Sequence, residues 1–297
     1  ARTKANDTLN ISASVFHLVD SIIEPKNNVS FIGNFTLSAG TSLIMNSVIN
    51  RTSRFNITSP NFTLTAGSVI LSDGAGFASD SGPAFGVAGA TLAGSGAGHG
   101  GKGMPGESVP NQPYDNPLNP EEAGSGGASE SASFLGGRGG GVVFIRSSFS
   151  NLSGNISVDG VLPPPEGTKN TGGAGGSINI LVGNLTGGGF LTAKGANASS
   201  GGMILVQYNF TQIPITNLEV QGDGGAEHGT AAMFDLDDNS LNIRQGWRWV
   251  KQASWNYTLL NVSNARTKAN DTLNISASVF HLINSTIEGN TNDSFIG

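Results

Sequence analysis

Short runs that alternate apolar and polar residues recur along the chain and predict β-strands. Each run has four to eight residues, is rich in Val, Ile, Leu, Phe and Thr, and is bounded by Gly, Asn, Ser or Asp. This pattern is typical of strands with one buried face. The runs lie near Leu9, Phe31, Phe55, Val142, Ile178, Met203, Met233 and Tyr257, and the pattern returns at Leu273. No segment keeps an apolar period of about 3.6 residues over three turns, so we expect no long helix.

The spacing of the runs predicts how the strands are arranged. Neighbouring runs lie roughly 20 to 35 residues apart, whereas the turns of a β-sandwich come about every 8–12 residues. The wider spacing is typical of a parallel β-helix (β-solenoid), in which successive coils stack at about 4.8 Å. We therefore predict an all-β fold of this type, and a sandwich with long loops is the alternative.

Residues 73–141 interrupt this rhythm. They contain 20 Gly and six Pro, a density that does not support continuous strands. A flexible linker is one interpretation. However, Tyr114 and Leu118 are interspersed, and glycine permits close packing of the backbone. We expect an ordered Gly/Pro-rich excursion that lies on the solenoid.

The chain repeats its own beginning at its end. Residues 1–33 and 265–297 are identical at 26 of 33 positions, at an offset of 264 residues. Residues 1–264 therefore form one unit of a tandem repeat in a longer protein, and residues 265–297 begin the next unit. No Gly or Pro separates the last strand-like run, near Tyr257, from the next unit. We expect the end of each unit to pack against the start of the next, so that copies continue head to tail along a filament.

Composition argues against several partners and chemistries. The chain has no Cys, 12% charged residues and a net charge of −6 without a Lys/Arg-rich run. These features exclude a disulfide scaffold and a thiol enzyme, and they argue against nucleic acid or an anionic membrane as the main partner. No apolar stretch approaches the roughly 18 residues that a membrane span requires, so we expect no membrane span in this segment.

The strongest functional signal is the number of N-glycosylation sequons, Asn-x-Ser/Thr. Of the 30 Asn, 18 lie in a sequon, whereas composition alone would give roughly six. They are Asn6, Asn10, Asn28, Asn34, Asn50, Asn56, Asn61, Asn151, Asn155, Asn184, Asn197, Asn209, Asn256, Asn261, Asn270, Asn274, Asn284 and Asn292. We expect covalent N-linked glycans, no other cofactor, and a eukaryotic secretory route that ends at the cell surface or outside the cell. The 73–141 segment contains no sequon, so we expect it to be the largest surface without sugar.

Catalytic chemistry has little support in the sequence. Glu227 and His228, near Asp223, are acid–base candidates, but adjacent residues of a strand point to opposite faces. Residues 235–240 (DLDDNS) loosely resemble a calcium loop but lack the Gly and Glu that such a loop needs, so a surface turn is favoured. We expect no catalytic residue and no metal ligand. A polysaccharide-active enzyme is a distant third hypothesis.

All three tryptophans of the chain, Trp247, Trp249 and Trp255, fall within nine positions. An aromatic face can stack on a sugar ring, so carbohydrate contact is one hypothesis, although such clusters more often close a core. Carbohydrate contact would make the protein an adhesin-type binding module that recognises a glycan or a surface. This is the alternative to a structural role.

The order of the glycine-rich segments resembles a known class of protein. GGRGGGVVFI (136–145), GGAGGSINILVG (172–183) and GGMILVQY (201–208) follow one another within a match that spans roughly residues 94–208. The chain resembles the glycine-rich β-helical repeats of large secreted and cell-surface proteins in protists and some bacteria. This resemblance implies a structural or adhesive role and supplies no catalytic residues. The sequon density favours a eukaryotic member, such as a glycosylated extracellular fibril or flagellar-hair component.

We therefore expect a structural, heavily N-glycosylated extracellular protein whose tandem units stack into a filament. Each unit would cover the open sheet edge of the previous one, which would otherwise invite uncontrolled pairing. If eight coils share one column, a unit advances the filament by about 38 Å.

Overall fold

The computed structural model shows a protein built almost entirely of β-strands. It describes residues 2–5, 9–18, 22–25, 29–37, 42–44, 54–89, 94–106, 111–129, 135–162, 171–249, 255–269, 273–289 and 294–296. Before residue 54 only the side chains of Ile11 and Phe16 are described, and residues 294–296 are described by their backbone. The helical content of these residues is a single 3-10 turn, η1 (Ile215–Asn217). The expected all-β class is confirmed.

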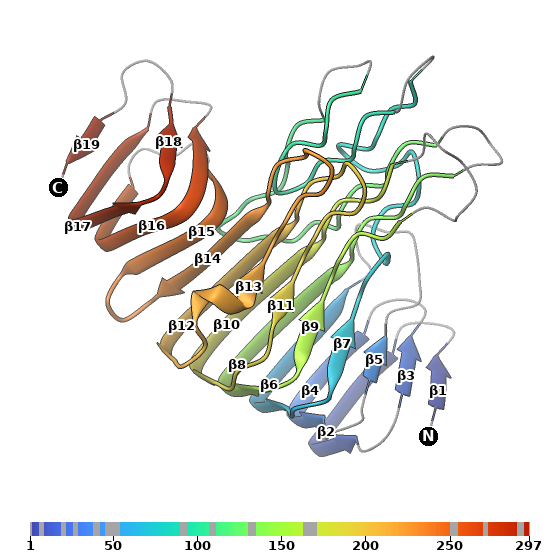
Figure 1. The fold of residues 1–297 in the computed structure, drawn as a ribbon. Helices are drawn as coiled ribbons and strands as arrows, with labels where there is room; N and C mark the ends of the chain where they lie inside the picture. The colour runs from blue at the N-terminus through green and yellow to red at the C-terminus, as the bar shows by residue number, and fades with distance from the viewer. Residues whose placement is uncertain are drawn as a thin grey trace.

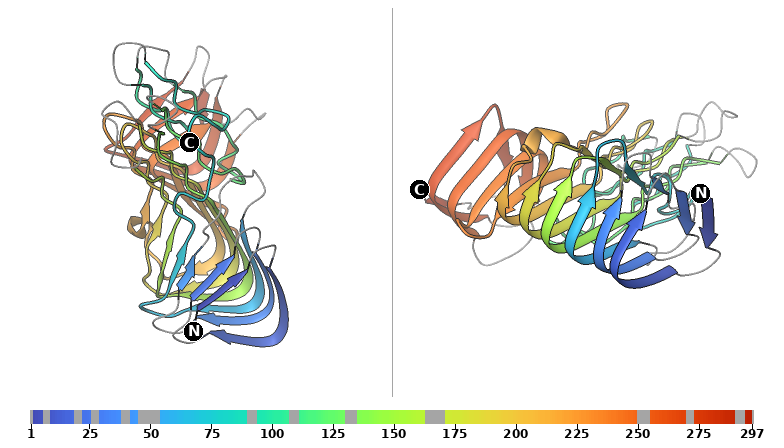
Figure 2. Two further views of the ribbon diagram at one scale, coloured as in Figure 1. Left: turned by 90° about the vertical axis from the view of Figure 1, so that its right-hand side faces the viewer. Right: turned by 90° about the horizontal axis from the view of Figure 1, so that it is seen from below.

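Twelve strands form a long sheet that runs the length of the molecule (Figure 1). In chain order they are β2 (Leu9–Leu18), β4 (Val29–Leu37), β6 (Phe55–Leu64), β8 (Val142–Leu152), β10 (Ser177–Thr186), β12 (Met203–Thr211), β14 (Thr230–Asp235), β15 (Ser240–Trp249), β16 (Trp255–Ala269), β17 (Asn274–Ile283), β18 (Thr286–Glu288) and β19 (Ser294–Ile296). β2 lies at one end of the stack, and β17 and β19 lie at the other (Figure 2).

Seven short strands form a second sheet alongside the first. They are β1 (Arg2–Ala5), β3 (Ile22–Pro25), β5 (Ser42–Ile44), β7 (Val69–Leu71), β9 (Asn155–Ser157), β11 (Leu191–Thr192) and β13 (Leu218–Glu219). Up to β13, strands of the two sheets alternate along the chain, so each coil adds one strand to each sheet. The pairs of the short sheet are all parallel.

The long sheet is mixed, because β14 and β15 pair antiparallel. This finding corrects the expectation of parallel strands throughout. A tight turn at residues 236–239 reverses the chain: Asp235 Oδ1 accepts the amides of Asp237 at 3.0 Å and Asp238 at 3.1 Å, and Asn239 has a φ of 49°. Asp and Asn favour such turns because their side chains bond to nearby backbone and tolerate positive φ. The other described pairs of the long sheet are parallel.

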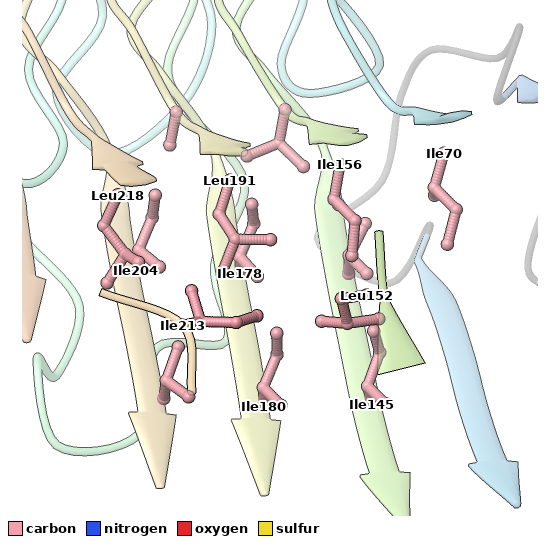
Figure 3. Close-up of a cluster of buried hydrophobic side chains, with 14 of the residues drawn as sticks. Ile70, Ile145, Leu152, Ile156, Ile178, Ile180, Leu191, Ile204, Ile213 and Leu218 are labelled. Atoms are coloured by element: carbon pink, nitrogen blue, oxygen red, sulfur yellow. The ribbon is translucent and has the colours of Figure 1, made fainter. Parts of the chain in front are cut away.

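The main hydrophobic core lies between the two sheets (Figure 3). Apolar residues that are in register on neighbouring strands form rows across the coils. The rows include Ile145 with Ile180, Ile178 with Ile204, and, on the short sheet, Ile156 with Leu191 and Leu218. Burying apolar surface contributes roughly 25 cal/mol per Å², and each coil gains this stabilisation only against its neighbours.

The glycine-rich segments of successive coils form a further layer, seen beyond the strands in Figure 1. The amide of Gly124 donates to the carbonyl of Gly140, and the amide of Gly140 donates to the carbonyl of Ala174, both at 2.9 Å. The described parts of residues 73–141 are therefore tied together by backbone hydrogen bonds, as expected for an ordered excursion. They are not a separate insertion, however, because they share this layer with residues 171–202.

Residues 111–129 also cover the outer face of the long sheet beside β10. Ser177 Oγ donates to the carbonyl of Glu122 at 2.7 Å, and Asn179 Nδ2 donates to Asn119 Oδ1 at 2.9 Å. Both partners on the sheet are fully buried. The excursion therefore supplies the hydrogen bonds that buried polar side chains require.

The second copy of the repeated sequence adopts the pairing of the first. In the first copy β1 pairs with β3, and in the second copy the end of β16 pairs with β18 in the same register, 264 residues further on. β2 with β4 and β17 with β19 are related in the same way. The boundary between the units lies inside β16, so that residues 255–264 belong to one unit and residues 265–269 to the next.

Candidate functional site

The outward faces of the strands and their connecting turns carry the sequon asparagines. Those with exposed side chains are Asn56, Asn61, Asn155, Asn184, Asn197, Asn209, Asn256, Asn274 and Asn284, and those with half-buried side chains are Asn151 and Asn261. Asn10 and Asn34 are described by their backbone alone, and Asn6, Asn28, Asn50, Asn270 and Asn292 lie outside the described residues. None of the sequon side chains in the described part is buried, and accessibility is what an attached sugar requires.

β10 shows how the sheet separates the two kinds of asparagine. Asn179, which is not in a sequon, is fully buried and bonded to residues 119 and 120. Asn184, which begins the sequon Asn184-Leu185-Thr186, is exposed. The buried amide has protein partners, as buried polar groups need, and the sequon amide faces water.

Asn261 is the described sequon residue that fits a glycan least well. Its Nδ2, the atom to which a sugar would be linked, donates to Oδ1 of Asn242 on neighbouring β15 at 3.1 Å. Its own Oδ1 is buried without a hydrogen-bond partner. A sugar on this nitrogen would disturb the contact between the two strands, so we expect lower occupancy at Asn261 than at Asn184.

The three tryptophans are packed together inside the protein. Trp247 and Trp249 are 3% exposed and Trp255 is 2% exposed. Trp249 meets the other two rings edge to face, with centroids 6.0 Å and 5.0 Å apart, and its Nε1 donates to Thr267 Oγ1 at 3.0 Å. The indole faces are therefore closed to an external sugar. This corrects the hypothesis of carbohydrate contact: the tryptophans belong to a second core where the two units meet.

A cavity of about 260 Å³ lies beside this second core. The glycine-rich layer contributes Lys102 and residues 225–228 to its lining, and β15 contributes residues 245–248. The start of the next unit contributes Arg266 and Lys268. The cavity is therefore composite, because its wall is complete only where two units adjoin.

Four cationic side chains line the cavity: Lys102, Arg248, Arg266 and Lys268. Two of them have carboxylate partners, since Lys268 Nζ pairs with Glu227 and Arg266 Nε lies 2.5 Å from Glu288 Oε1. The hydrogen bond from Arg266 lowers the pKa of Glu288. Both pairs are at least partly exposed, so water screens them and their contribution to stability is small.

Arg248 and Lys102 leave the cavity with positive charge. The guanidinium of Arg248 donates to the backbone carbonyl of Asp115. Burial lowers the pKa of Arg248, and the charge of Asp115 opposes this effect; an arginine nevertheless stays protonated at physiological pH. The ammonium group of Lys102 has no ion pair among the residues that the structure describes. The cavity can therefore attract a small anionic group.

Glu227 and His228 both line the cavity, although adjacent strand residues were expected to face opposite ways. The reason is that residues 222–229 form a turn, in which His228 Nδ1 accepts the amide of Gly222 at 3.2 Å. Glu227 Oε2 also accepts the amide of Lys102 at 3.1 Å, so its carboxylate has structural partners. Asp223 lies in the same turn and accepts the amide of Gly224 at 2.7 Å.

Within the described ranges, no group of three or more His, Asp or Glu side chains could hold a metal ion. The same ranges contain no helix that is long and apolar enough to span a membrane. Comparisons with known proteins find no matching family model, no matching curated protein and no matching solved structure. The function is therefore inferred from the geometry of this chain.

Proposed function

We propose that this chain is a structural repeat whose units of 264 residues continue one another as a parallel β-helix and form an extracellular filament. The observation that carries the proposal is strand β16, which crosses the boundary between units without interruption. Both halves of β16 pair with β15 of the first unit, and β17 and β18 of the second unit pair with it as well. The second unit thus extends the sheet of the first and is not separated from it by a linker.

An apolar rim at the end of the second copy supports this continuation. Val279, Leu282 and Ile283 of β17 are 45 to 49% exposed. In the first copy, the corresponding part of β2 pairs with residues 34–37 of β4. The equivalents of those residues follow Gly297, so a further coil would pair with this rim and bury it.

The experiment that tests the filament is a measurement of its axial repeat. Nine strand-to-strand steps of the long sheet separate β2 from its copy β17, one step more than the sequence suggested. We therefore expect a rise of about 43 Å per unit along a straight filament. Electron microscopy of a recombinant chain of several units measures this rise. Beads joined by linkers, or a rise of roughly 80 Å, would contradict a single continuous stack.

The sequons assign the filament to the eukaryotic secretory route. Glycans on the outward faces would prevent sheets of neighbouring filaments from pairing, a task that charged residues perform elsewhere and for which this chain has few charges. Glycopeptide mass spectrometry of native material should find sugar at Asn34, Asn61, Asn151 and Asn184. Unmodified asparagines at these sites would remove the extracellular part of the proposal and leave the filament untouched.

A binding module is the second candidate, and the cavity between the units favours it. Its surplus positive charge and its volume of about 260 Å³ suit one acidic sugar residue. A glycan array probed with the chain and with its Arg248→Gln variant tests this function. Lys194→Gln is the control, because Lys194 is paired with Glu219 and does not line the cavity. Loss of acidic-glycan binding in the Arg248 variant alone would favour the binding module; an array with no hit in the parent chain would reject it.

A further inference from the structure

The outer face of the long sheet presents two exposed phenylalanines beside one sequon asparagine. Phe149 is 37% exposed and Phe210 is 51% exposed. Asn184 of β10 is in register with Phe149 of β8 on one side and with Phe210 of β12 on the other. Neighbouring strands lie about 4.8 Å apart, and register partners project from the same face. The side chain of Asn184 therefore rises between two phenyl rings.

A shared bend in the strands turns these side chains outward. In β10, Asn184 directly precedes the buried Leu185, and in β8, Phe149 directly precedes the buried Ser150. The hydroxyls of Ser147 and Ser150 are hydrogen-bonded at 2.6 Å across the bend of β8. The outward direction of the three side chains thus follows from the backbone path and not from packing on the core.

The placement of the two rings needs an explanation. Neither ring belongs to a hydrophobic cluster of the described residues. Single exposed apolar side chains are common on protein surfaces, but here two rings flank the same asparagine. Phe149 is also in register with the sequon residue Asn61 of β6, so this ring lies between two sequon positions.

We propose that Phe149 and Phe210 clamp the first sugar of an N-linked glycan on Asn184, an N-acetylglucosamine. This inference rests on the proposed N-glycosylation. The sugar ring is bonded directly to Nδ2, so it begins at the height above the sheet that the phenyl rings occupy. One face of a pyranose ring consists mainly of C–H groups, which are attracted to the negative face of an aromatic ring, and both surfaces leave water on contact.

The test uses the chain secreted by eukaryotic cells, with occupancy of Asn184 established first by glycopeptide mass spectrometry. A double-mutant cycle then combines Asn184→Gln with Phe149→Ala/Phe210→Ala and compares melting temperatures. We expect Asn184→Gln to lower Tm by about 2 °C or more in the parent chain and to have almost no effect once the rings are absent. Strong non-additivity would support the clamp.

Leu181→Ala is the matched control for this cycle. Leu181 lies on the same strand and is 37% exposed, but its register partners are Arg146 and Gln207. Its effect should therefore add to that of Asn184→Gln. A cycle with the phenylalanines that is equally additive would count against the clamp.

A second measurement holds even if the alanine variants fold poorly. In NMR spectra of the glycosylated chain, ring currents should shift the signals of the first N-acetylglucosamine upfield, and Phe149→Leu, which keeps an apolar side chain, should reduce this shift. An unoccupied Asn184 would overturn the proposed glycosylation at this site and the clamp with it. An occupied Asn184 with unshifted sugar signals and an additive cycle would overturn the clamp alone.

Discussion

At the scale of single residues, glycine decides where the backbone segments of different coils can meet. A Cβ atom added at Gly140 would lie 1.8 Å from the carbonyl oxygen of Val158, and one at Gly202 would lie 2.0 Å from that of Gly176. Neither glycine has a positive φ. These positions therefore need glycine because of the close approach of two backbones, which leaves no volume for a side chain.

Gly202→Ala should consequently destabilise the protein by about 1–3 kcal/mol, the usual effect of overpacking. Gly188→Ala is the matched control, because an added Cβ there meets no atom within 4 Å. The control should be neutral or stabilising by up to about 1 kcal/mol, since alanine restricts the unfolded chain. Chemical denaturation measures both variants, and equal stabilities would show that the glycine-rich layer has room to spare.

At the scale of elements, one carboxylate holds the covering segment at residues 111–129. Asp115 Oδ2 accepts the amides of Glu121 and Glu122, both at 2.8 Å. The same oxygen lies 3.6 Å from Nε2 of the fully buried His99. This contact is longer than an ordinary hydrogen bond, so we regard it as mainly electrostatic. Asp115 therefore joins its own loop to the glycine-rich layer.

The attachment of this segment should weaken in acid. Burial alone would raise the pKa of Asp115, but His99 and the amides of Glu122 and Asn116 lower it below the ordinary value of 3.8. A carboxyl group whose pKa is lower in the folded state stabilises the fold above its unfolded pKa, and this stabilisation is lost as the pH falls through the folded value. Protection of the amides of residues 111–122 against hydrogen exchange should therefore decrease below about pH 4.

Asp115→Asn should show the same loss of protection already at pH 6, because the amide side chain carries no charge. Asp237→Asn, in the exposed turn between β14 and β15, is the control and should leave the segment unchanged. Unaltered protection in the Asp115 variant would mean that the remaining hydrogen bonds hold the segment without the carboxylate.

At the scale of the whole molecule, each unit depends on the next one for part of its core. Leu260 and Val262, at the end of the first unit, are fully buried in one cluster with Leu273 and Ile275 of the second. The hydrogen bond from Trp249 to Thr267 also crosses the boundary. A unit without its successor would lose these partners and present an open sheet edge.

A chain cut after residue 264 should therefore aggregate or fray at its end, in contrast to residues 1–297. Burying one Leu or Ile side chain is worth about 1.5–3 kcal/mol, so amides of residues 257–262 should exchange at least roughly tenfold faster in the shorter chain. Hydrogen exchange and light scattering on the two chains make the comparison. A monomeric short chain with equally slow exchange would show that the units are self-contained domains.

Local features of the sequence determined the class of the fold and the likeness of its two ends. Period-two alternation reports which side chains face inward on a strand, and it needs no knowledge of neighbours. The repeated segment folds alike in both copies because the same side chains meet the same register partners. The reversal at β14 and β15 was missed, although the Asp-rich turn at residues 235–239 was a visible signal for it.

Only the tertiary structure decided which residues from distant coils lie together. The cavity joins Lys102, Arg248 and Lys268, and the clamp joins Phe149, Asn184 and Phe210, none of them neighbours in the sequence. In a stack of coils, the register between strands depends on the length and path of every connection between them, including the excursion between β7 and β8. A local pattern shows the face on which a side chain lies, but the packing of whole coils selects its neighbours.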